Sequence, residues 1–311
     1  MVDNRKTLLM RSEPMRVGFI GTGSIGQPMA GQVLAAGFSL VVHDIDRSSA
    51  TPLLEAGAEW GDSPKEVARH CDIVCTCLPG PPEFQQVVYG TDGILEGIAA
   101  GSVLVDHTTN SPELVRDTHR SLESAGVAML DAPVSGGAEG ARTRDLTMLV
   151  GGDSDIIDRC KPVLDAIART VMHVGDIGAG CVCKIAHNCA GFSLDMAMVE
   201  CLTVGVRAGV EPSVLVEVFQ KCAIGRNFNL HTRLPDTLFS GDFEPRFALK
   251  TAMKDMRLAT DLAERYRVPM NLTDVCQAEM EEAMTRGWAD LDSSAFLRLQ
   301  EERSGVQLRL V

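Results

Sequence analysis

The chain has 311 residues, of which 45% are hydrophobic and 23% are charged, and this length suits two globular domains better than one core. Its formal net charge of −13 argues against nucleic acid or an anionic membrane as the main partner, because polyphosphate binding requires a basic face. The ten cysteines have no disulfide-framework spacing, which favours a reducing cytoplasm, and no apolar run reaches membrane-spanning length.

Short apolar runs alternate with helical segments after a tail at residues 1–14, as expected for a doubly wound parallel sheet. Strands are predicted at 15–20, 39–43, 73–78, 103–106, 127–130, 146–150 and 171–174, and helices at 28–36, 48–56, 63–70, 111–124 and 154–168. From residue 178 the strand patterns stop. Helices are predicted there at about 178–209, 212–222, 229–238, 247–266, 270–286 and 294–302.

A glycine-rich turn, Gly21-Thr22-Gly23-Ser24-Ile25-Gly26, lies between the first predicted strand and the first predicted helix. Gly21 makes the tight turn, Gly23 lets a pyrophosphate approach the backbone, and Gly26 allows close packing of helix on strand. The N-terminus of the helix then offers amide donors to the phosphates. The turn therefore predicts a dinucleotide site.

Asp44 follows the second predicted strand, where an acidic side chain can accept hydrogen bonds from the adenosine ribose and repel a 2′-phosphate. This residue favours NAD over NADP. Arg47 supports the alternative, because an arginine just past this strand can hold that phosphate instead.

Polar loops follow the strands at Gly21, Leu78, Thr109 and Asp131, and they are expected to meet at the carboxyl edge of the sheet. The last of them continues into Ser135-Gly136-Gly137, whose hydroxyl and backbone N–H groups can bind a carboxylate. A flexible hairpin loop is the alternative interpretation of these three residues.

Lys184 and Asn188 lie four residues apart near the start of the long helix at 178–209, so they share one face. Their neighbours are largely apolar, and an ammonium and an amide there need partners, of which a substrate is one candidate. A lysine that extends its amine to solvent is the alternative. The nearby Cys181, Cys183, His187 and Cys189 offer only one i, i+4 pair and no Cys-x-x-Cys, so no metal site is expected.

Four motifs in order resemble those of the β-hydroxyacid dehydrogenases, which include 3-hydroxyisobutyrate dehydrogenase and tartronate semialdehyde reductase. They are Val17–Ala30, Asp131–Gly137 with Gly140-Ala141, Gly178-x-Gly180-x-x-x-Lys184-x-x-x-Asn188, and Lys254-Asp255-Met256. Two departures occur: Arg144-Asp145 stands where the family often has Gly-Thr, and Cys189 where a second asparagine is common.

The resemblance implies an α/β fold in three parts: a flexible tail (1–14), a Rossmann-type NAD-binding domain (15–177), and an all-α substrate and oligomerisation domain (178–311) that begins with the long helix. Lys184 is then catalytic, and Ser135, Gly136, Gly137 and Asn188 bind the substrate. Cofactor contacts are expected from Gly21, Thr22, Gly23, Ser24, Ile25, Gly26, Asp44, Leu78, Pro79, Glu83, Thr109 and Lys254.

We therefore hypothesise an NAD-dependent, cytoplasmic homodimer or homotetramer that oxidises a small anionic β-hydroxy acid reversibly, with Lys184 taking the hydroxyl proton. The pKa of a lysine in water is too high for this, so burial and a nearby positive charge, for which Lys254 is the candidate, must lower it. Arg226, Asn227 and His231 are candidates for contact with the distal group of the substrate. The alternatives are a non-catalytic NAD-binding module and an imine or semialdehyde reductase that uses NADPH on the same scaffold.

Overall fold

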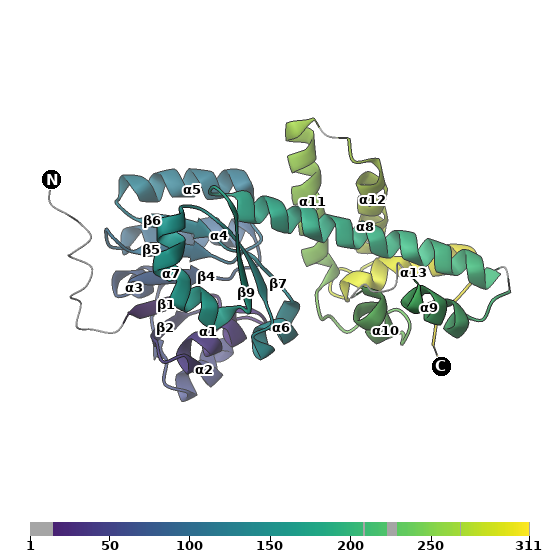
Figure 1. Cartoon of the computed structure of the whole chain (residues 1–311), viewed down its shortest axis with the longest axis horizontal. Helices are drawn as coiled ribbons and strands as arrows, with labels where there is room; N and C mark the ends of the chain where they lie inside the picture. The colour runs from purple at the N-terminus through teal and green to yellow at the C-terminus, as the bar shows by residue number, and fades with distance from the viewer. Residues whose placement is uncertain (1–14, 208, 223–228, 268, 311) are drawn as a thin grey trace. The chain divides into compact units, whose positions relative to one another are not determined.

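The computed structural model describes residues 15–207, 209–222, 229–267 and 269–310 (Figure 1). The chain divides into two compact units between Lys184 and Ile185. Helix α8 (Ala179–Arg207) begins in the first unit and continues into the second.

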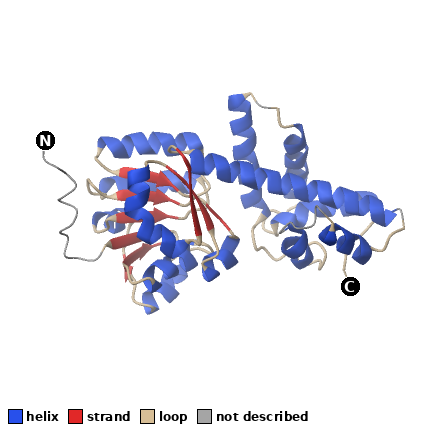
Figure 2. Ribbon diagram, in the orientation of Figure 1, coloured by secondary structure: helices blue, strands red, loops and turns tan. Residues whose placement is uncertain are grey.

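The first unit is built on one sheet, whose strands are drawn red in Figure 2. They are β1 (Arg16–Ile20), β2 (Ser39–His43), β3 (Glu59–Trp60), β4 (Ile73–Thr76), β5 (Val103–Asp106), β6 (Ala128–Asp131), β7 (Val134–Ser135), β8 (Thr147–Gly151) and β9 (Thr170–Gly175). The order is β3-β2-β1-β4-β5-β6-β8-β7, and β9 pairs with β8. The strands from β3 to β6 along this order run parallel, whereas β8 is antiparallel to β6 and β7. This confirms the predicted doubly wound, Rossmann-type sheet.

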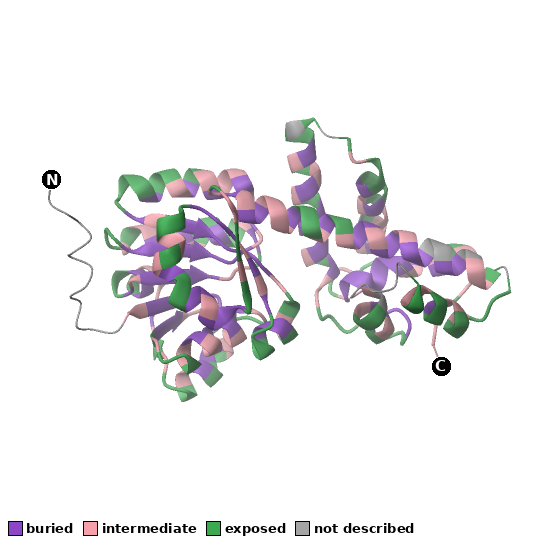
Figure 3. Cartoon of the chain, viewed as in Figure 1, coloured by how far each residue is buried: buried purple, intermediate pink, exposed green. Residues whose placement is uncertain are grey.

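Helices cover both faces of this sheet, and its central strands are buried (purple in Figure 3). These strands are apolar on both sides, as a sheet covered on both faces requires. Phe19 and Val105 belong to one buried cluster, while Ile20 and Leu104 belong to the cluster on the other face. The covering helices are α1 (Gly26–Ala35), α2 (Thr51–Glu55), α3 (Pro64–Arg69), α4 (Pro81–Tyr89), α5 (Pro112–Ser124), α6 (Gly137–Thr143) and α7 (Ser154–Ile167), with 3₁₀ turns η2 (Arg47–Ala50) and η3 (Ile94–Glu96).

Two of these helices, α4 and α6, were not predicted. Gly80, Pro81 and Pro82 resemble a loop in sequence, but proline is well tolerated at the first helical positions, where no N–H is needed, and Phe84 and Val88 then bury one face. Helix α6 begins within the predicted glycine loop and follows the two-residue strand β7.

The regular elements of the second unit, over its described residues, are all helices or helical turns, apart from an isolated bridge between Ala248 and Asp292. After α8 come α9 (Pro212–Lys221), the π-helical turn η5 (Asn229–Arg233), α10 (Leu234–Asp236), α11 (Leu249–Tyr266), α12 (Asn271–Thr285), the 3₁₀ turn η6 (Ser293–Leu297) and α13 (Arg298–Ser304). The helix predicted at 229–238 is helical over 229–236, where the π-helical turn is followed directly by the α-helical turn that contains Pro235. No helix in the described ranges is long and apolar enough to cross a membrane.

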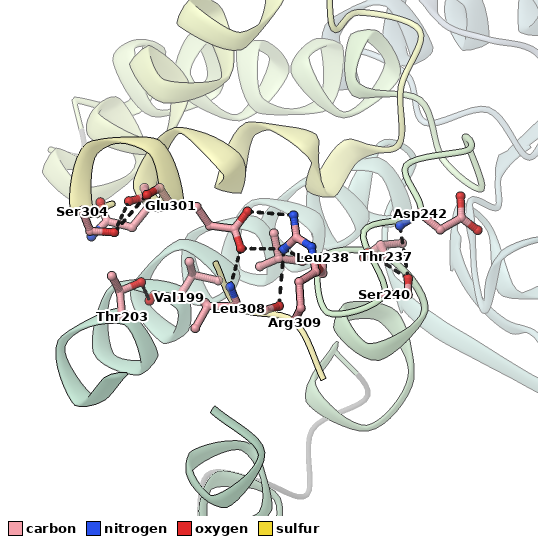
Figure 4. Close-up of polar contacts among 11 residues, drawn as sticks. Val199, Thr203, Thr237, Leu238, Ser240, Asp242, Glu301, Ser304, Leu308 and Arg309 are labelled. Carbon is pink, nitrogen blue, oxygen red and sulfur yellow. Dashed lines mark hydrogen bonds and ion pairs between the residues drawn. The ribbon is translucent and has the colours of Figure 1, made fainter. Parts of the chain in front are cut away.

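The C-terminal segment is attached to the helical unit through Glu301, which is 5% exposed (Figure 4). Its Oε1 accepts hydrogen bonds from the backbone N–H of Leu308 and from Arg309 Nη1, both at 2.6 Å, and Arg309 Nη2 lies 3.2 Å from Oε2. Arg309 Nη1 also donates to the carbonyl of Leu238 at 2.8 Å. The buried side chain of Leu308 completes the attachment.

We expect Glu301→Ala to lower the free energy of unfolding by about 2–3 kcal/mol, because a buried N–H and a guanidinium lose their acceptor. The neighbouring Glu302 provides a matched control, since it pairs with Arg286 at the surface. Glu302→Ala should cost less than about 1 kcal/mol. Denaturant unfolding of both variants measures the difference, and equal losses would contradict the assignment.

Candidate active site

The predicted glycine-rich turn connects β1 to α1 at the carboxyl edge of the sheet. Gly21 has a φ of +92°, and a Cβ there would lie 2.3 Å from the carbonyl oxygen of Cys77. A Cβ on Gly26 would lie 2.0 Å from the carbonyl oxygen of Gly21. Gly23 instead faces open space, because a Cβ added to it would have no neighbouring atom within 4 Å. The turn therefore fits a pyrophosphate that approaches the backbone at Gly23, beside a helix with no acidic side chain in its first turn.

Asp44 is held in place next to this turn by two backbone N–H groups. Its Oδ2 accepts from the N–H of Thr22 at 2.6 Å, and its Oδ1 accepts from the N–H of Asp46 at 2.9 Å. Thr22 Oγ1 lies 2.6 Å from Ser49 Oγ, which fixes the other side of the loop. The carboxylate is thus oriented before any ribose binds.

A buried network connects the loops after β4 and β5. Asp106, at the end of β5, accepts hydrogen bonds from Thr76 Oγ1 (2.8 Å), the N–H of Thr108 (3.0 Å) and Asn110 Nδ2 (3.0 Å). Thr108 Oγ1 in turn accepts from the N–H of Leu78 at 3.1 Å. Because Ile20, Thr76, Asp106 and Asp131 are in register across β1, β4, β5 and β6, the loops that follow lie side by side.

Burial shifts the pKa values of two adjacent groups in this network in opposite directions. It raises the pKa of Asp106 from 3.8 to about 6, since the loss of hydration outweighs the hydrogen bonds from Asn110 and Thr108. It lowers the pKa of His107 from 6.5 to about 4, despite the bond of Nδ1 to the carbonyl of Ala132. Protonated Asp106 stabilises the fold below pH 3.8, and this stabilisation is lost as the pH rises through 6. Neutral His107 stabilises it above pH 6.5, and this is lost as the pH falls through 4.

Asp106 and His107 each contribute on the order of 3 kcal/mol to the free energy of unfolding, and between about pH 4 and 6 these contributions change in opposite directions. We expect Asp106→Asn to remove one of them, so that the free energy of unfolding falls more steeply than in the wild type as the pH drops from 6.5 to 4. His107→Asn should change the slope in the opposite direction. Denaturant unfolding at a series of pH values measures the slopes, and three parallel curves would contradict the prediction.

The predicted substrate loop is partly helical. Ser135 closes strand β7, Gly136 is the N-cap residue of α6 with a φ of +133°, and Gly137 is its first residue with a φ of +63°. Arg144 is the C-cap residue of α6 and has the left-handed φ of +60° that glycine adopts readily. Its guanidinium donates to the carbonyl of Asp165. The departure at Arg144 therefore keeps a glycine-like backbone. Ser135 and Gly137 thus belong to regular elements, a strand and a helix, and not to a loop.

Asp131, at the end of β6, holds the N-terminus of α8. Its Oδ1 accepts from the N–H of Gly178 and its Oδ2 from the N–H of Cys181, both at 2.7 Å. The backbone approaches closely here, because a Cβ on Gly151 would lie 2.4 Å from Asp131 Oδ1, and one on Gly180 would lie 2.4 Å from the carbonyl oxygen of Leu149. Burial raises the pKa of Asp131 even though these N–H groups favour its ionised form. A strand residue thus supplies the cap that this helix needs.

Lys184 is half-buried and lies one turn beyond this cap, and Asn188 follows on the same face of α8. In the second unit, Asn188 Nδ2 donates to Asp255 Oδ2 at 2.7 Å, and Lys254 Nζ lies 2.7 Å from Asp255 Oδ1. The structure therefore brings Asn188 and Lys254 together through a carboxylate that is 2% exposed. Asp255 was part of a sequence motif but was not predicted as a site residue.

The remaining predicted residues lie as follows. Pro79 and Glu83 are exposed, with Glu83 in the first turn of α4, while Leu78 and Thr109 are partly buried. His231 is exposed on the π-helical turn, and Arg226 and Asn227 lie outside the described residues. In the described ranges, no group of three or more His, Cys, Asp or Glu side chains is placed to hold a metal ion.

Two family descriptions match successive parts of the chain. Residues 16–175 match the NAD-binding domain of 6-phosphogluconate dehydrogenase, and residues 178–300 match the NAD-binding domain of NADP-dependent 3-hydroxyisobutyrate dehydrogenase. The two ranges adjoin at the loop before α8 and together span most of the chain.

Individual relatives match over nearly their full length. 2-(Hydroxymethyl)glutarate dehydrogenase of Eubacterium barkeri is 31% identical over 294 residues, which cover 94% of this chain and 97% of that one. NAD-dependent L-serine dehydrogenase of Pseudomonas aeruginosa is 31% identical over 93% of this chain and 99% of its own. The crystal structure of a 3-hydroxyisobutyrate dehydrogenase from Salmonella typhimurium superposes with a TM-score of 0.83 at 30% identity, covering 92% and 99%.

Proposed function

This chain belongs to the β-hydroxyacid dehydrogenase family, and we propose that it transfers hydride reversibly between NAD and the hydroxyl-bearing carbon of a small β-hydroxy acid. One observation carries the proposal: Lys184 and Asn188 share a face of α8 directly after an N-terminus fixed by buried Asp131. A helix anchored in this way holds its first turns rigidly, as a catalytic amine requires.

Binding of NAD rather than NADP is supported by the orientation of Asp44. Its carboxylate is fixed by the N–H groups of Thr22 and Asp46, next to the open approach at Gly23. A fixed negative charge there suits ribose hydroxyls and repels a 2′-phosphate. The relative from Pseudomonas aeruginosa is named as NAD-dependent, whereas one matching family description names an NADP-dependent enzyme, so the choice depends on residues around this loop.

The bound nicotinamide supplies the hydride acceptor. Lys184 receives the proton of the substrate hydroxyl in the oxidative direction and returns it in the reductive direction. Asn188 uses one amide hydrogen for Asp255 and presents the other to a substrate oxygen. The hydroxyl of Ser135 and the N–H groups of Gly136 and Gly137 hold the carboxylate, so that the reacting carbon is oriented.

The decisive experiment is a panel of β-hydroxy acids offered with NAD and with NADP in parallel, in which the reduced nicotinamide is followed. 3-Hydroxyisobutyrate, 2-(hydroxymethyl)glutarate and L-serine are the first members, since relatives are named for them. We expect at least one acid to be oxidised, with a higher kcat/KM with NAD than with NADP. If the purified chain binds NADH but oxidises none of them, or oxidises them better with NADP, the proposal is contradicted in reaction or in cofactor.

We further propose that the enzyme is a homodimer or homotetramer in the cytoplasm. The nine described cysteines are free, which suits a reducing compartment. Light scattering of the purified chain gives the number of subunits, and a monomer would contradict this part of the proposal.

A further inference from the structure

The side chain of Arg47 stacks on an indole ring next to the adenosine end of the proposed cofactor site. Its guanidinium carbon lies 5.0 Å from the centroid of the Trp60 ring, a cation–π distance. Arg47 is the first residue of η2, three positions after Asp44, and it is exposed. It is therefore the cation nearest in sequence to the position where a ribose 2′-phosphate would bind.

The Trp60 ring is fixed from two further sides. Its Nε1 donates to Asp62 Oδ1 at 2.9 Å, and its ring centroid lies 5.4 Å from that of His43, tilted by 39°. His43 Nδ1 is in turn bonded to the carbonyl of Gly61 at 2.9 Å. Because β3 pairs with β2 in the register of Trp60 with Val42, this platform stands directly beside the strand that ends before Asp44.

Asp44 and Arg47, the charged residues on the two sides of this loop, have different contacts. Asp44 is oriented by backbone N–H groups, whereas Arg47 forms no salt bridge with Asp44 or with any other carboxylate in the described part of the chain. Asp46, which lies between them in the sequence, accepts hydrogen bonds from the N–H and the hydroxyl of Ser48. The stacking contact with Trp60 is therefore what holds the guanidinium.

We propose that Trp60 contributes to cofactor specificity by retaining Arg47 on its ring, so that Asp44 is the charged group that faces the ribose 2′ position. This rests on the proposed preference for NAD and adds a residue to it. A 2′-phosphate can form an ion pair with Arg47 only after the contact between Arg47 and the indole is broken. This requirement lowers the affinity for NADP and leaves the affinity for NAD unchanged.

The test is calorimetric titration of the full chain with NADH and with NADPH, which needs no substrate. We expect Trp60→Leu to tighten NADPH binding by about two- to fivefold, the amount that corresponds to an exposed cation–π contact, with NADH changed less than about twofold. Arg47→Ala in the wild-type background should leave both dissociation constants within about twofold. In the Trp60→Leu background, Arg47→Ala should remove the gain in NADPH binding.

Three results would overturn the proposal. Equal weakening of NADH and NADPH by Trp60→Leu would mean that the indole contacts the adenine itself. Weaker NADPH binding in Arg47→Ala alone would mean that Arg47 already reaches the phosphate. A gain in Trp60→Leu that survives Arg47→Ala would assign it to another cation. If Trp60→Leu does not fold, Trp60→Phe, with a smaller ring, should give a smaller gain, and the Arg47→Ala result still decides.

Failure of the proposed reaction would look different. A chain that binds both cofactors yet oxidises no β-hydroxy acid would contradict the function and leave the titrations interpretable. A wild-type chain that binds NADPH more tightly than NADH would contradict the NAD preference and this proposal together.

Discussion

Replacing Lys184 by methionine should lower kcat by about two to four orders of magnitude, the usual contribution of a general acid or base, while NADH binds as before. The reason is that methionine fills a similar volume but can neither accept nor return the hydroxyl proton. Stopped-assay or continuous turnover measurements give kcat, and titration with NADH gives the dissociation constant.

Two further variants separate proton transfer from charge. Lys184→Arg keeps the positive charge but cannot lose its proton near neutral pH, so it should be as inactive as the methionine variant. Ala186→Gln, at an exposed position on the same turns of α8, should keep wild-type turnover. Substantial activity in Lys184→Arg would reduce the role of the lysine to electrostatics, and full activity in Lys184→Met would end the catalytic assignment.

Asp131→Ala is expected to lower the free energy of unfolding by about 2–4 kcal/mol and to reduce turnover as well. Two N–H groups, of Gly178 and Cys181, lose a buried acceptor, and each unsatisfied buried group costs about 1–3 kcal/mol. Turnover falls because Lys184 lies one turn beyond the loosened cap. Denaturant unfolding and kcat measured on the same preparation test both parts.

Asp153 offers the matched control, because it caps α7 at the surface through the N–H of Asp155 at 2.7 Å. Asp153→Ala should cost about 0.5–1 kcal/mol and leave turnover unchanged. Asp131→Asn, which keeps the shape and one acceptor oxygen, should fall between the two alanine variants. Equal effects of Asp131→Ala and Asp153→Ala on both stability and turnover would show that the buried cap has no special role.

Local patterns in the sequence were enough to predict the alternating sheet, the glycine turn and the long helix. Each of these features depends on residues that are neighbours in the sequence. Short apolar runs indicate the strands, Gly21 to Gly26 indicate the turn, and the Pro-free run after Gly180 indicates the helix. The acid at Asp44 could also be placed, because its distance from the turn is set by one strand and one helix.

The sequence did not reveal contacts between distant segments. Asp131 accepts a hydrogen bond from Gly178, 47 residues later, and Asp255 accepts one from Asn188, 67 residues earlier, so no local pattern records either bond. Helix α4 was missed for a different reason: Pro81 and Pro82 signal a loop and a helix start equally well. The untested roles of Lys184 and Ser135 stay predictions.

The close packing around Asp131 has a practical consequence for engineering. Any side chain at residue 151 or 180 would displace the first turn of α8 from its packing against β6 and β8, and the amine at residue 184 would shift with it. Libraries built to accept a new acid should therefore keep these glycines and Asp131 constant. Diversity belongs instead on exposed positions of α6, such as Glu139 and Thr143, where changes can reshape the surface beside the glycine loop without disturbing the helix base.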